Sequence, residues 1–419
     1  MTRPANRTLG LSDQRSDSAH GQSPGSASAA DRWLLSTIMA ALPRSGFAVM
    51  LWDGTTFGEQ TGVRVLIRDR AALWQLARNP PVHFGDLYSV GRIEVEGDLV
   101  VFLERLYRAM VGGRGGRHSA WWWLWKDPRP RAGSLTRARE NIHHHYNLGN
   151  AFYRLWLDGE AMQYTCAYYP APGMTLEAAQ RAKMDHVCRK LRLRSGQRVI
   201  EAGSGWGGFA LHMARHYGVT VRACNISGEQ VRYAREWAAR EGLADRIEFV
   251  EDDYRDIRGR CDAFVSVGML EHVGVDHYAE LGRVIGRCLA PNGLGLIHSI
   301  GRNAPGRMNG WIERRIFPGA YPPSLGEMTQ IFEPLRFSVL DVENLRLHYA
   351  QTLRDWRARF GANLETVRSM YDTAFTRAWD LYLAGSIAGF SAGTLQLYQV
   401  VFARGTNNEV PATRSDLYA

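Results

Sequence analysis

The sequence contains few cysteines and no paired cysteine motif. The five cysteines are an odd number, lie far apart and include no C-x-x-C pair: Cys166, Cys188, Cys224, Cys261 and Cys288. This pattern argues against a disulfide framework and against a zinc finger, and it favours a reducing compartment.

Long apolar runs are also missing. The segment 1–32 has no apolar stretch of the kind that a signal peptide needs, and no uncharged apolar run approaches the length of a membrane-spanning helix. We therefore expect a cytoplasmic protein whose contact with a membrane is peripheral, at the inner face.

Positive charge is in excess. The 419 residues carry a formal net charge of +9 at pH 7, with a pI near 9.4, which indicates an anionic partner, either nucleic acid or an anionic membrane surface, or else only a soluble basic enzyme. No helix-turn-helix or RNA-binding signature is present, so we expect no nucleic acid partner.

Composition divides the chain into five segments. Its length suggests two domains plus tails, and 45% hydrophobic residues suffice for globular cores. We predict a disordered tail at residues 1–30 and a small α+β domain for lipid docking or dimerisation at 31–112. A Gly/Arg/Trp-rich linker at 113–139 leads to a catalytic domain at 140–405, and a C-terminal tail follows at 406–419.

Two features near the linker have competing interpretations. The tryptophans at 121, 122, 123 and 125 lie among arginines, which is typical of a membrane-interface segment but also of a linker packed on its neighbour. The histidines at 143–145 suggest a metal, but consecutive helical residues point in different directions and cannot converge on one ion. We expect no metal site.

The stretch Gln197–Gly218 organises the rest of the chain. A short apolar run leads into a loop with Gly203, Gly205, Gly207 and Gly208, and a helical pattern follows. Such a strand-loop-helix turn holds a nucleotide-type ligand or serves only as a tight corner. Apolar strands then alternate with helices up to residue 300, which predicts an α/β fold with a parallel sheet covered on both faces.

Polar residues follow each predicted strand and should meet at one edge of the sheet. They are Gly203 and Gly205, then Asn225 with Gln230, then Asp252 and Asp253, then Glu271 and His272, and finally His298. A dinucleotide fold would place an acid where Asn225 stands, which disfavours NAD. Asp252 or Asp253 would accept from an adenine amino group.

Glu271 and His298 are the acid–base candidates at this edge, because they face the half of the crevice away from the glycine loop. Each also has a structural interpretation. Glu271 would then be a carboxylate at a helix N-terminus, and His298 a buried histidine bonded to the backbone.

With these residues the chain resembles the cyclopropane-fatty-acyl-phospholipid synthases, which are S-adenosylmethionine-dependent methyltransferases related to the mycolic acid cyclopropane synthases. The resemblance covers residues 140–405 through HHYNLGNAFYRLWLD, MQYTCAYY, VIEAGSGWGGFA, VSVGMLEHVG, LIHSIG, IFPGAYPPS, HYAQTLRDW and LQLYQVVFAR. It implies a Rossmann-like class I methyltransferase domain, with a small N-terminal α+β domain like that of the phospholipid-acting members.

The resemblance also implies two sets of site residues. S-adenosylmethionine would be held by Tyr164, Thr165, Gly203, Gly205, Asn225, Gln230, Asp252 and Asp253. A bicarbonate ion would be held by Cys166 and Ile300 through their backbone N–H groups, and by Glu271, His298 and Tyr349. Cys166 has a rival interpretation as a thiolate nucleophile, which its neighbours disfavour because none is a base or a cation.

The implied reaction adds a methylene group to the cis double bond of unsaturated phospholipid acyl chains. An alkene attacks the sulfonium methyl only when it is held close and dry, and bicarbonate removes a proton from the resulting carbocation. The chain departs from the family at four positions: Asn147, Ser204, Asn225 and Ser299. None is a bicarbonate ligand, but the outcome between ring closure and a methyl branch or methylene stays open.

Two other functions remain under consideration at this stage: a methyltransferase for a small soluble molecule, and a non-enzymatic lipid carrier. Charge, the tryptophan-rich linker and aromatics of residues 371–398 favour a lipid tunnel over a small polar pocket, although helical aromatics also fit an ordinary core. The expected partners are unsaturated phospholipid acyl chains and an anionic membrane, and a second copy of the chain is a further candidate partner.

Overall fold

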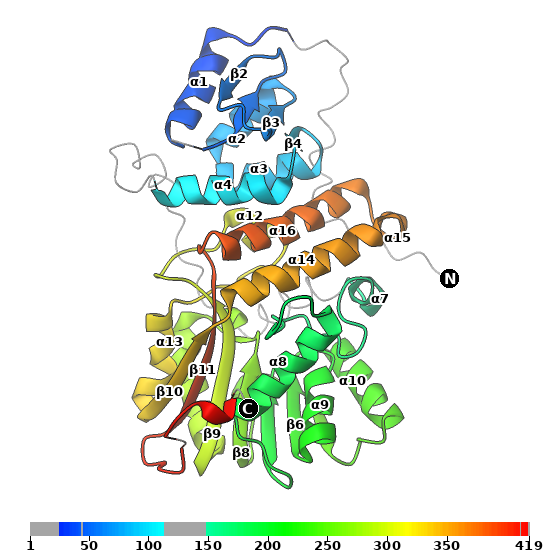
Figure 1. Ribbon diagram of the computed structural model, residues 1–419, viewed down its shortest axis with the longest axis vertical. Helices are drawn as coiled ribbons and strands as arrows, with labels where there is room; N and C mark the ends of the chain where they lie inside the picture. The colour runs from blue at the N-terminus through cyan, green and yellow to red at the C-terminus, as the bar shows by residue number, and fades with distance from the viewer. Residues whose placement is uncertain (1–24, 43–44, 113–147, 411, 418–419) are drawn as a thin grey trace. The chain divides into compact units, whose positions relative to one another are not determined.

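The structure is a computed structural model that describes residues 25–42, 45–112, 148–410 and 412–417 (Figure 1). Two compact units form. The smaller one combines residues up to 129 with 309–317 and 353–394, and the larger one combines 130–308, 318–352 and the residues from 395 onward. The predictions for the first 24 residues, the linker, the histidines at 143–145 and Asn147 lie outside the described residues. The five-segment division stays a prediction.

The smaller unit contains a four-stranded sheet in the order β2-β1-β3-β4. The strands pair antiparallel except β1 and β3, which are parallel. The N-terminal elements are α1 Ala29–Ala40, β1 Ala48–Met50, β2 Thr56–Gly58, β3 Arg64–Ile67, α2 Arg70–Arg78, α3 Pro80–Ser89, β4 Ile93–Glu96 and α4 Leu99–Gly112. The predicted strands and the helix after them are present, which confirms the small α+β element of the fold.

The same unit includes helices from the C-terminal third of the chain. They are α12 Gly310–Arg315, α15 Leu364–Met370, α16 Thr373–Ser391 and the second part of α14 Arg346–Ala362. Helix α16 packs on α3 and α4, and its Phe375, Trp379 and Phe390 are at most 1% exposed. Arg377 of α16 pairs with Glu94 at 2.8 Å. These aromatics therefore belong to an ordinary helical core of the smaller unit.

The larger unit is built on a seven-stranded sheet in the order β10-β11-β9-β8-β5-β6-β7. Its strands are β5 Arg198–Ala202, β6 Thr220–Asn225, β7 Ile247–Glu251, β8 Cys261–Val267, β9 Leu289–Gly301, β10 Phe337–Asn344 and β11 Gln396–Arg404. The first five are mutually parallel, as predicted. The alternation pattern did not indicate β10 and β11, which pair antiparallel and make the sheet mixed.

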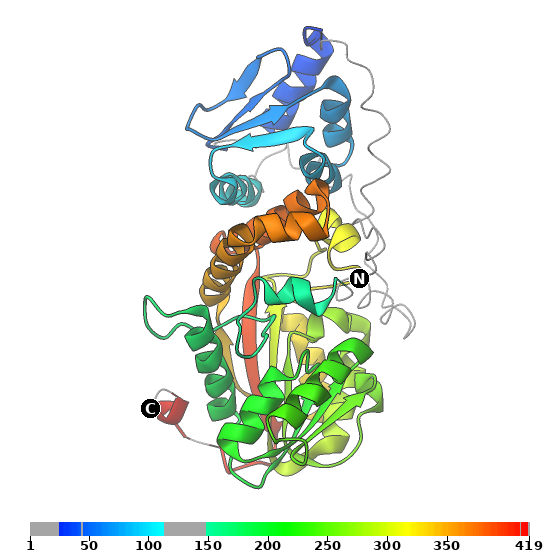
Figure 2. The same cartoon turned by 90° about the vertical axis from the view of Figure 1, so that its right-hand side faces the viewer.

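Helices cover both faces of this sheet (Figure 2). Helices α8 Leu176–Lys190, α9 Gly208–Tyr217 and α10 Gly228–Arg240 bury apolar side chains on one face. Helices α11 Tyr278–Cys288 and α13 Leu325–Phe332 do so on the other. The short α7 Asn150–Arg154 precedes them in the chain. This arrangement confirms the predicted α/β fold, because strands buried on both sides have continuous apolar sequences.

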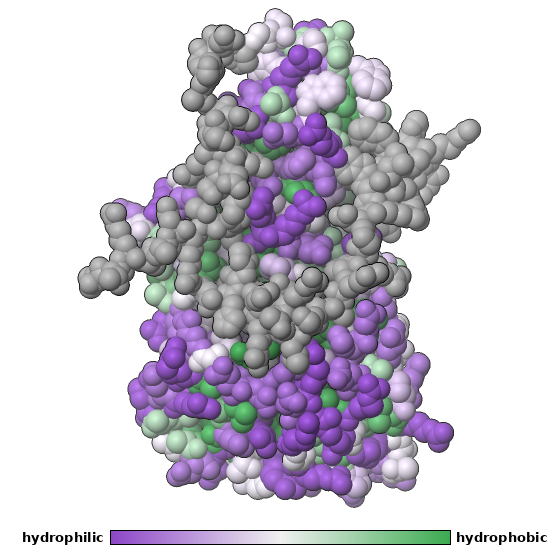
Figure 3. All heavy atoms as spheres, turned by 180° about the vertical axis from the view of Figure 1, so that it is seen from behind, coloured by the Kyte–Doolittle hydropathy of each residue, from purple (hydrophilic) through white to green (hydrophobic). Residues whose placement is uncertain are grey.

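The surface of the larger unit is mostly hydrophilic where Figure 3 shows it, with scattered hydrophobic residues. None of the helices within the described ranges has the length and apolarity needed to cross a bilayer. All five cysteines are buried and free of disulfide bonds, as expected from their odd number and wide spacing.

Candidate functional site

A cavity lies at the carboxyl ends of β5 to β8, where ligands bind in open parallel sheets. We call it the glycine-loop cavity. It is lined by all eight residues that the sequence assigned to the cofactor: Tyr164, Thr165, Gly203, Gly205, Asn225, Gln230, Asp252 and Asp253. The structure thus brings these residues together, although four separate stretches of the sequence supply them.

The glycine loop connects β5 to α9 with a backbone that favours glycine. Gly203 and Gly205 have φ angles of +88° and +53°, in the left-handed region that other residues adopt at a cost. A Cβ on Gly205 would meet no atom within 4 Å. The loop therefore turns tightly and leaves open space at Gly205, on the side from which a ligand approaches.

Asn225 ties the glycine loop to α10. Its Nδ2 donates to the Gly205 carbonyl at 3.0 Å and to Gln230 Oε1 at 2.8 Å, while its Oδ1 accepts from the Ser227 backbone N–H at 3.2 Å. Ser227 caps α10. All the hydrogen-bonding groups of the Asn225 amide are thus engaged within the protein, so this side chain shapes the cavity wall.

Asp252 and Asp253 lie just past β7. Asp253 is 4% exposed, and its Oδ1 accepts from the Arg255 backbone N–H and lies 3.0 Å from the Arg255 guanidinium. Asp252 Oδ1 accepts from the Asp253 backbone N–H, also at 3.0 Å. Asp253 thereby fixes the start of the 3-10 helix Tyr254–Asp256, and each carboxylate keeps one oxygen outside these bonds.

Five buried polar atoms that belong to the cavity lining have no hydrogen-bond partner among the described residues. They are Glu201 Oε2, Ser204 Oγ, Gln230 Nε2, the Tyr254 hydroxyl and Arg255 Nε, of which the last forms an ion pair with Asp253. Buried polar groups are nearly always paired in folded proteins. Their gathering in one cavity fits a polar ligand that offers both donors and acceptors, such as an adenosine with an amino-acid side chain.

Glu201 and Tyr254 are cavity residues that the sequence analysis missed. Glu201 lies inside β5, at 2% exposure, and burial raises the pKa of its carboxyl to about 8. A charged residue inside an otherwise apolar strand was the available signal. A cationic ligand group near Glu201 would favour its ionised form.

The cavity wall at Met162–Thr165 is held by buried charges from two other segments. Asp158 accepts from the backbone N–H groups of Ala161 and Gln163 at 2.6 and 2.7 Å. Lys183 of α8, 1% exposed, donates to the side chains of Gln163 and Thr165. Burial lowers the pKa of Lys183 to about 8.

Glu271 follows β8 and bonds to β9. Pairing of β8 ends at Val267 opposite His298, so the Ile300 N–H lies beyond the end of β8. That N–H donates to Glu271 Oε1 at 2.6 Å. Glu271 is 7% exposed, its Oε2 has no partner among the described residues, and burial raises its pKa to about 7.

His298 lies on β9, two residues before Ile300, so the two side chains are on the same face. It is 1% exposed. Its Nδ1 lies 3.1 Å from Gln399 Nε2, whereas its Nε2 has no partner within the described part of the chain. Burial lowers the pKa of His298 well below its usual value, so the ring is neutral. We call these residues the Glu271–His298 cluster.

Cys166 and Tyr349 lie on either side of the Leu345 carbonyl. The Cys166 thiol approaches this oxygen at 3.9 Å, and the Tyr349 backbone N–H donates to it at 3.1 Å. Burial raises the pKa of the Cys166 thiol, which argues against a thiolate nucleophile. The sequence prediction of a backbone role for Cys166 stays a prediction.

The five catalytic candidates are not in the described lining of the glycine-loop cavity, but chain neighbours of two of them are. Thr165 precedes Cys166, and His272 follows Glu271. The free atoms of the cluster, Glu271 Oε2 and His298 Nε2, are buried acceptor and donor sites that fit a small oxyanion carrying its own hydroxyl. One difference from expectation is that Ile300 N–H already binds Glu271.

Known proteins match this chain over most of its length. The family model described as mycolic acid cyclopropane synthetase matches residues 133–400. A probable fatty acid methyltransferase from Pseudomonas putida is 34% identical over 385 residues, which cover 88% of this chain and 95% of the relative. The cyclopropane-fatty-acyl-phospholipid synthase of Escherichia coli K12 is 40% identical over 271 residues, 64% of this chain and 69% of the relative.

A solved structure agrees with these matches. The mycolic acid cyclopropane synthase CmaA1, complexed with SAH and CTAB, superimposes with a TM-score of 0.60 at 28% identity, over 63% of this chain and 97% of that protein. The fold, the glycine-loop cavity and the matches to these relatives agree. The chain belongs to the mycolic acid cyclopropane synthetase family and is an S-adenosylmethionine-dependent methyltransferase.

Proposed function

We propose that this enzyme converts the cis double bonds of unsaturated phospholipid acyl chains into cyclopropane rings, with bicarbonate as the base. The observation that carries the proposal is that Glu271 Oε2 and His298 Nε2 are both buried and have no hydrogen-bond partner among the described residues. A relative that is 40% identical is named for this reaction. The family resemblance supplies the assignment of bicarbonate.

The glycine-loop cavity has the groups needed to bind S-adenosylmethionine, which supplies an electrophilic methyl group on a sulfonium. Gln230 Nε2 and the Tyr254 hydroxyl provide donors, and Glu201 provides an acceptor for a cationic group. Gly205 lets the ligand approach the backbone. The wall braced by Lys183 and Asp158 keeps the cavity in shape.

The Glu271–His298 cluster would hold bicarbonate, which supplies a small base for the proton lost on ring closure. Glu271 Oε2 would accept a hydrogen bond from the hydroxyl of the ion, and His298 Nε2 would donate one to an oxygen of the ion. A bound ion removes the need for a charged side chain in an acyl tunnel, where an unpaired charge is costly. Tyr349 and the Cys166 N–H complete the proposed set of ligands.

A second outcome has support from a specific comparison. The Pseudomonas putida relative, which aligns with this chain over 95% of its own length, is named a probable fatty acid methyltransferase. A 36% identical relative from Mycobacterium tuberculosis is named a tuberculostearic acid methyltransferase. Formation of a methyl branch or a methylene group instead of a ring is therefore the alternative. The two outcomes differ in how the carbocation is quenched.

The membrane part of the proposal rests on charge. A net charge of +9 favours peripheral binding to an anionic bilayer at the cytoplasmic face, with a homodimer as a further possibility for the smaller unit. Vesicle flotation tests this directly: binding to anionic vesicles at low salt should be lost at high salt, because screening weakens surface attraction. Binding that is insensitive to salt contradicts it.

Product analysis separates the reaction outcomes. Purified enzyme is incubated with S-adenosylmethionine and vesicles of cis-unsaturated phospholipid, and the released acyl chains are studied by mass spectrometry and proton NMR. Ring formation adds one CH₂ and gives upfield ring protons. A methylene product has the same mass but vinylidene protons, and a saturated methyl branch is heavier by two hydrogens. Either of these products contradicts the proposed ring closure.

A further inference from the structure

His298 faces Gln399 across two adjacent strands. The residues are directly opposite in the antiparallel register of β9 and β11, and the Gln399 side-chain nitrogen lies 3.1 Å from His298 Nδ1. Both residues are at most 1% exposed. The contact is therefore shielded from water, and Gln399 is the partner that decides which atom of the ring carries a proton.

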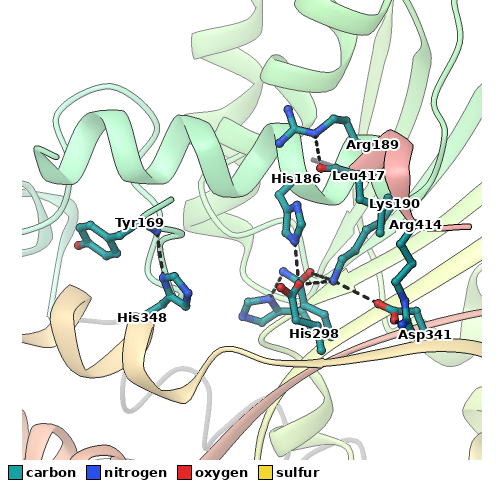
Figure 4. A network of polar contacts seen from close by, with 11 residues as sticks. Tyr169, His186, Arg189, Lys190, His298, Asp341, His348, Arg414 and Leu417 are labelled. Atoms are coloured by element: carbon teal, nitrogen blue, oxygen red, sulfur yellow. Dashed lines mark hydrogen bonds and ion pairs between the residues drawn. The ribbon is translucent and has the colours of Figure 1, made fainter. Parts of the chain in front are cut away.

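The orientation of the Gln399 amide is set by Lys190 of α8. The Lys190 ammonium group lies 2.7 Å from Gln399 Oε1, and an ammonium group only donates. The amide oxygen must therefore face Lys190, which places the amide NH₂ toward His298. Figure 4 shows Lys190 and His298 in the same polar network.

Lys190 is itself held in place by carboxylates of β10. Its ammonium lies 2.6 Å from Glu343 Oε2 and 3.7 Å from Asp341 Oδ2. The neighbouring His186 and Lys190 lower the pKa of Glu343 to about 2, so Glu343 is a carboxylate. Burial lowers the pKa of Lys190, but both carboxylates oppose this and favour its charged, donor-only form.

The proton on His298 then follows from hydrogen-bond chemistry. An amide NH₂ facing Nδ1 requires a lone pair on Nδ1, and a neutral imidazole with a lone pair on Nδ1 carries its proton on Nε2. Nε2 is the atom without a partner among the described residues. Its N–H is therefore available as a donor at the Glu271–His298 cluster.

We propose that Gln399, oriented by Lys190, is a positioning residue that fixes His298 as the Nε2–H tautomer, so that His298 donates a hydrogen bond to the small oxyanion of the reaction. The identity of the anion in this inference rests on the proposed function. The tautomer of His298 does not, because it is a property of the protein alone.

The ligand-free enzyme gives the first test. Protein labelled with ¹⁵N-histidine is studied by long-range ¹H–¹⁵N NMR, and the His298 ring signals are assigned by their loss in His298→Gln. We expect a protonated Nε2 and an unprotonated Nδ1. A protonated Nδ1, or both nitrogens protonated at pH 8, overturns the proposal, whatever product the enzyme makes.

Gln399→Glu gives the second test. A glutamate keeps the length of the side chain and the contact with Lys190, but its carboxylate only accepts, so the His298 proton should move to Nδ1. We expect the NMR signature to change accordingly and kcat to fall about 10–100-fold, as for other supporting partners of a functional histidine. The KM for S-adenosylmethionine should stay unchanged.

Gln396→Glu is the matched control for burying a carboxylate in β11. Gln396 lies on the same strand and is 4% exposed, and its Oε1 accepts a hydrogen bond from Asn344. This control should retain kcat. If Gln399→Glu shifts the tautomer but keeps wild-type kcat, or if Gln396→Glu loses as much activity, the positioning role is wrong. Bicarbonate dependence of the wild-type enzyme, measured separately, tests the proposed function itself.

Discussion

The hydrogen bonds of Asn225 in the glycine-loop cavity join residues at most 20 positions apart, whereas those of the Glu271–His298 cluster join residues 29 and 101 positions apart. In the cavity, Asn225 bonds to Gly205, Ser227 and Gln230. In the cluster, Glu271 depends on Ile300 of another strand, and His298 depends on Gln399, 101 positions later. Local turns shape the first region, and the assembled sheet positions the second.

This difference has an energetic consequence. The cavity borders on space that a large ligand fills, so its unpartnered groups are ready for binding. Glu271 and His298 are buried, and burial shifts both pKa values toward the neutral forms. We therefore expect changes in the cavity to affect cofactor affinity and changes in the cluster to affect turnover.

Glu271→Gln should have the largest effect. The amide keeps an oxygen for the Ile300 N–H but presents donors where Oε2 accepts. We expect kcat to fall about 10²–10⁴-fold, the range for loss of a positioned acid or base. Calorimetry should show that S-adenosylmethionine binding is retained.

Glu248→Gln is the control for Glu271→Gln, since the Glu248 side chain on β7 is 63% exposed. It should leave both kcat and cofactor binding unchanged. If Glu271→Gln abolishes cofactor binding together with turnover, the two regions are not separable in the way described.

Asn225→Ala should weaken cofactor binding with little change in kcat. The substitution leaves the Gly205 carbonyl and the Gln230 amide without their partner, and an unpaired buried group costs about 1–3 kcal/mol. The Kd for S-adenosylmethionine should rise about tenfold or more. The exposed Asn292→Ala serves as the control. A decrease in kcat with no change in the Kd for S-adenosylmethionine would contradict the assignment of Asn225 to cofactor binding.

The pH profile should report Glu271 rather than His298. Burial raises the pKa of Glu271 to about 7, and in the proposed reaction its ionised form would accept a hydrogen bond from the hydroxyl of the anion. At a constant bicarbonate concentration, kcat/KM should therefore rise up to about pH 7 and then level off. His298 has a pKa lowered well below its usual value, so it should add no step near neutrality. A rise centred at the pKa of an exposed carboxyl would disprove the assignment.

Glu201→Gln should have a smaller effect than the other substitutions, and this effect should be on the free energy of unfolding. The pKa of Glu201 is raised from 4.5 to about 8 in the folded protein, so the folded state binds more protons than the unfolded state between these values. The free energy of unfolding of the wild type should thus fall as pH rises through that interval. In Glu201→Gln the side chain does not titrate, so this decrease in the free energy of unfolding should be absent.

At pH 8 the variant should therefore melt higher than the wild type, by roughly 2–4 °C for each kcal/mol regained, with no difference near pH 4.5. Differential scanning calorimetry at the two pH values measures this, with Glu248→Gln as the control. A variant that is less stable at pH 8 would show that Glu201 is a stabilising carboxylate. Its affinity for S-adenosylmethionine should fall in either case, because Glu201 lines the cavity.

The difference between the glycine-loop cavity and the Glu271–His298 cluster also explains which features could be predicted from the sequence. The glycine loop, the strands β5 to β9 and the polar residues after them follow from local patterns, and the structure gathers all eight cofactor candidates in one cavity. Strands β10 and β11 escaped prediction because they pair through the long-range antiparallel register of a mixed sheet. No local pattern marks Gln399 as the partner of His298.

The aromatic residues of α16 show a further limit. Helical spacing of Phe375, Trp379 and Phe390 fits both a lipid tunnel and a core, and only packing on α3 and α4 distinguishes them. Likewise the sequence patterns did not lead us to predict a role for Lys183 or Glu201. Their burial beside the cavity depends on contacts that sequence spacing does not reveal.

The proposed reaction requires bicarbonate, and this requirement can be measured. Turnover of unsaturated phospholipid vesicles is measured in carbonate-depleted buffer and after titration with bicarbonate, with S-adenosylmethionine binding followed in parallel by calorimetry. We expect low turnover without bicarbonate, saturable restoration on titration and unchanged cofactor binding throughout. Full turnover in the depleted buffer, with no response to added bicarbonate, would contradict this requirement.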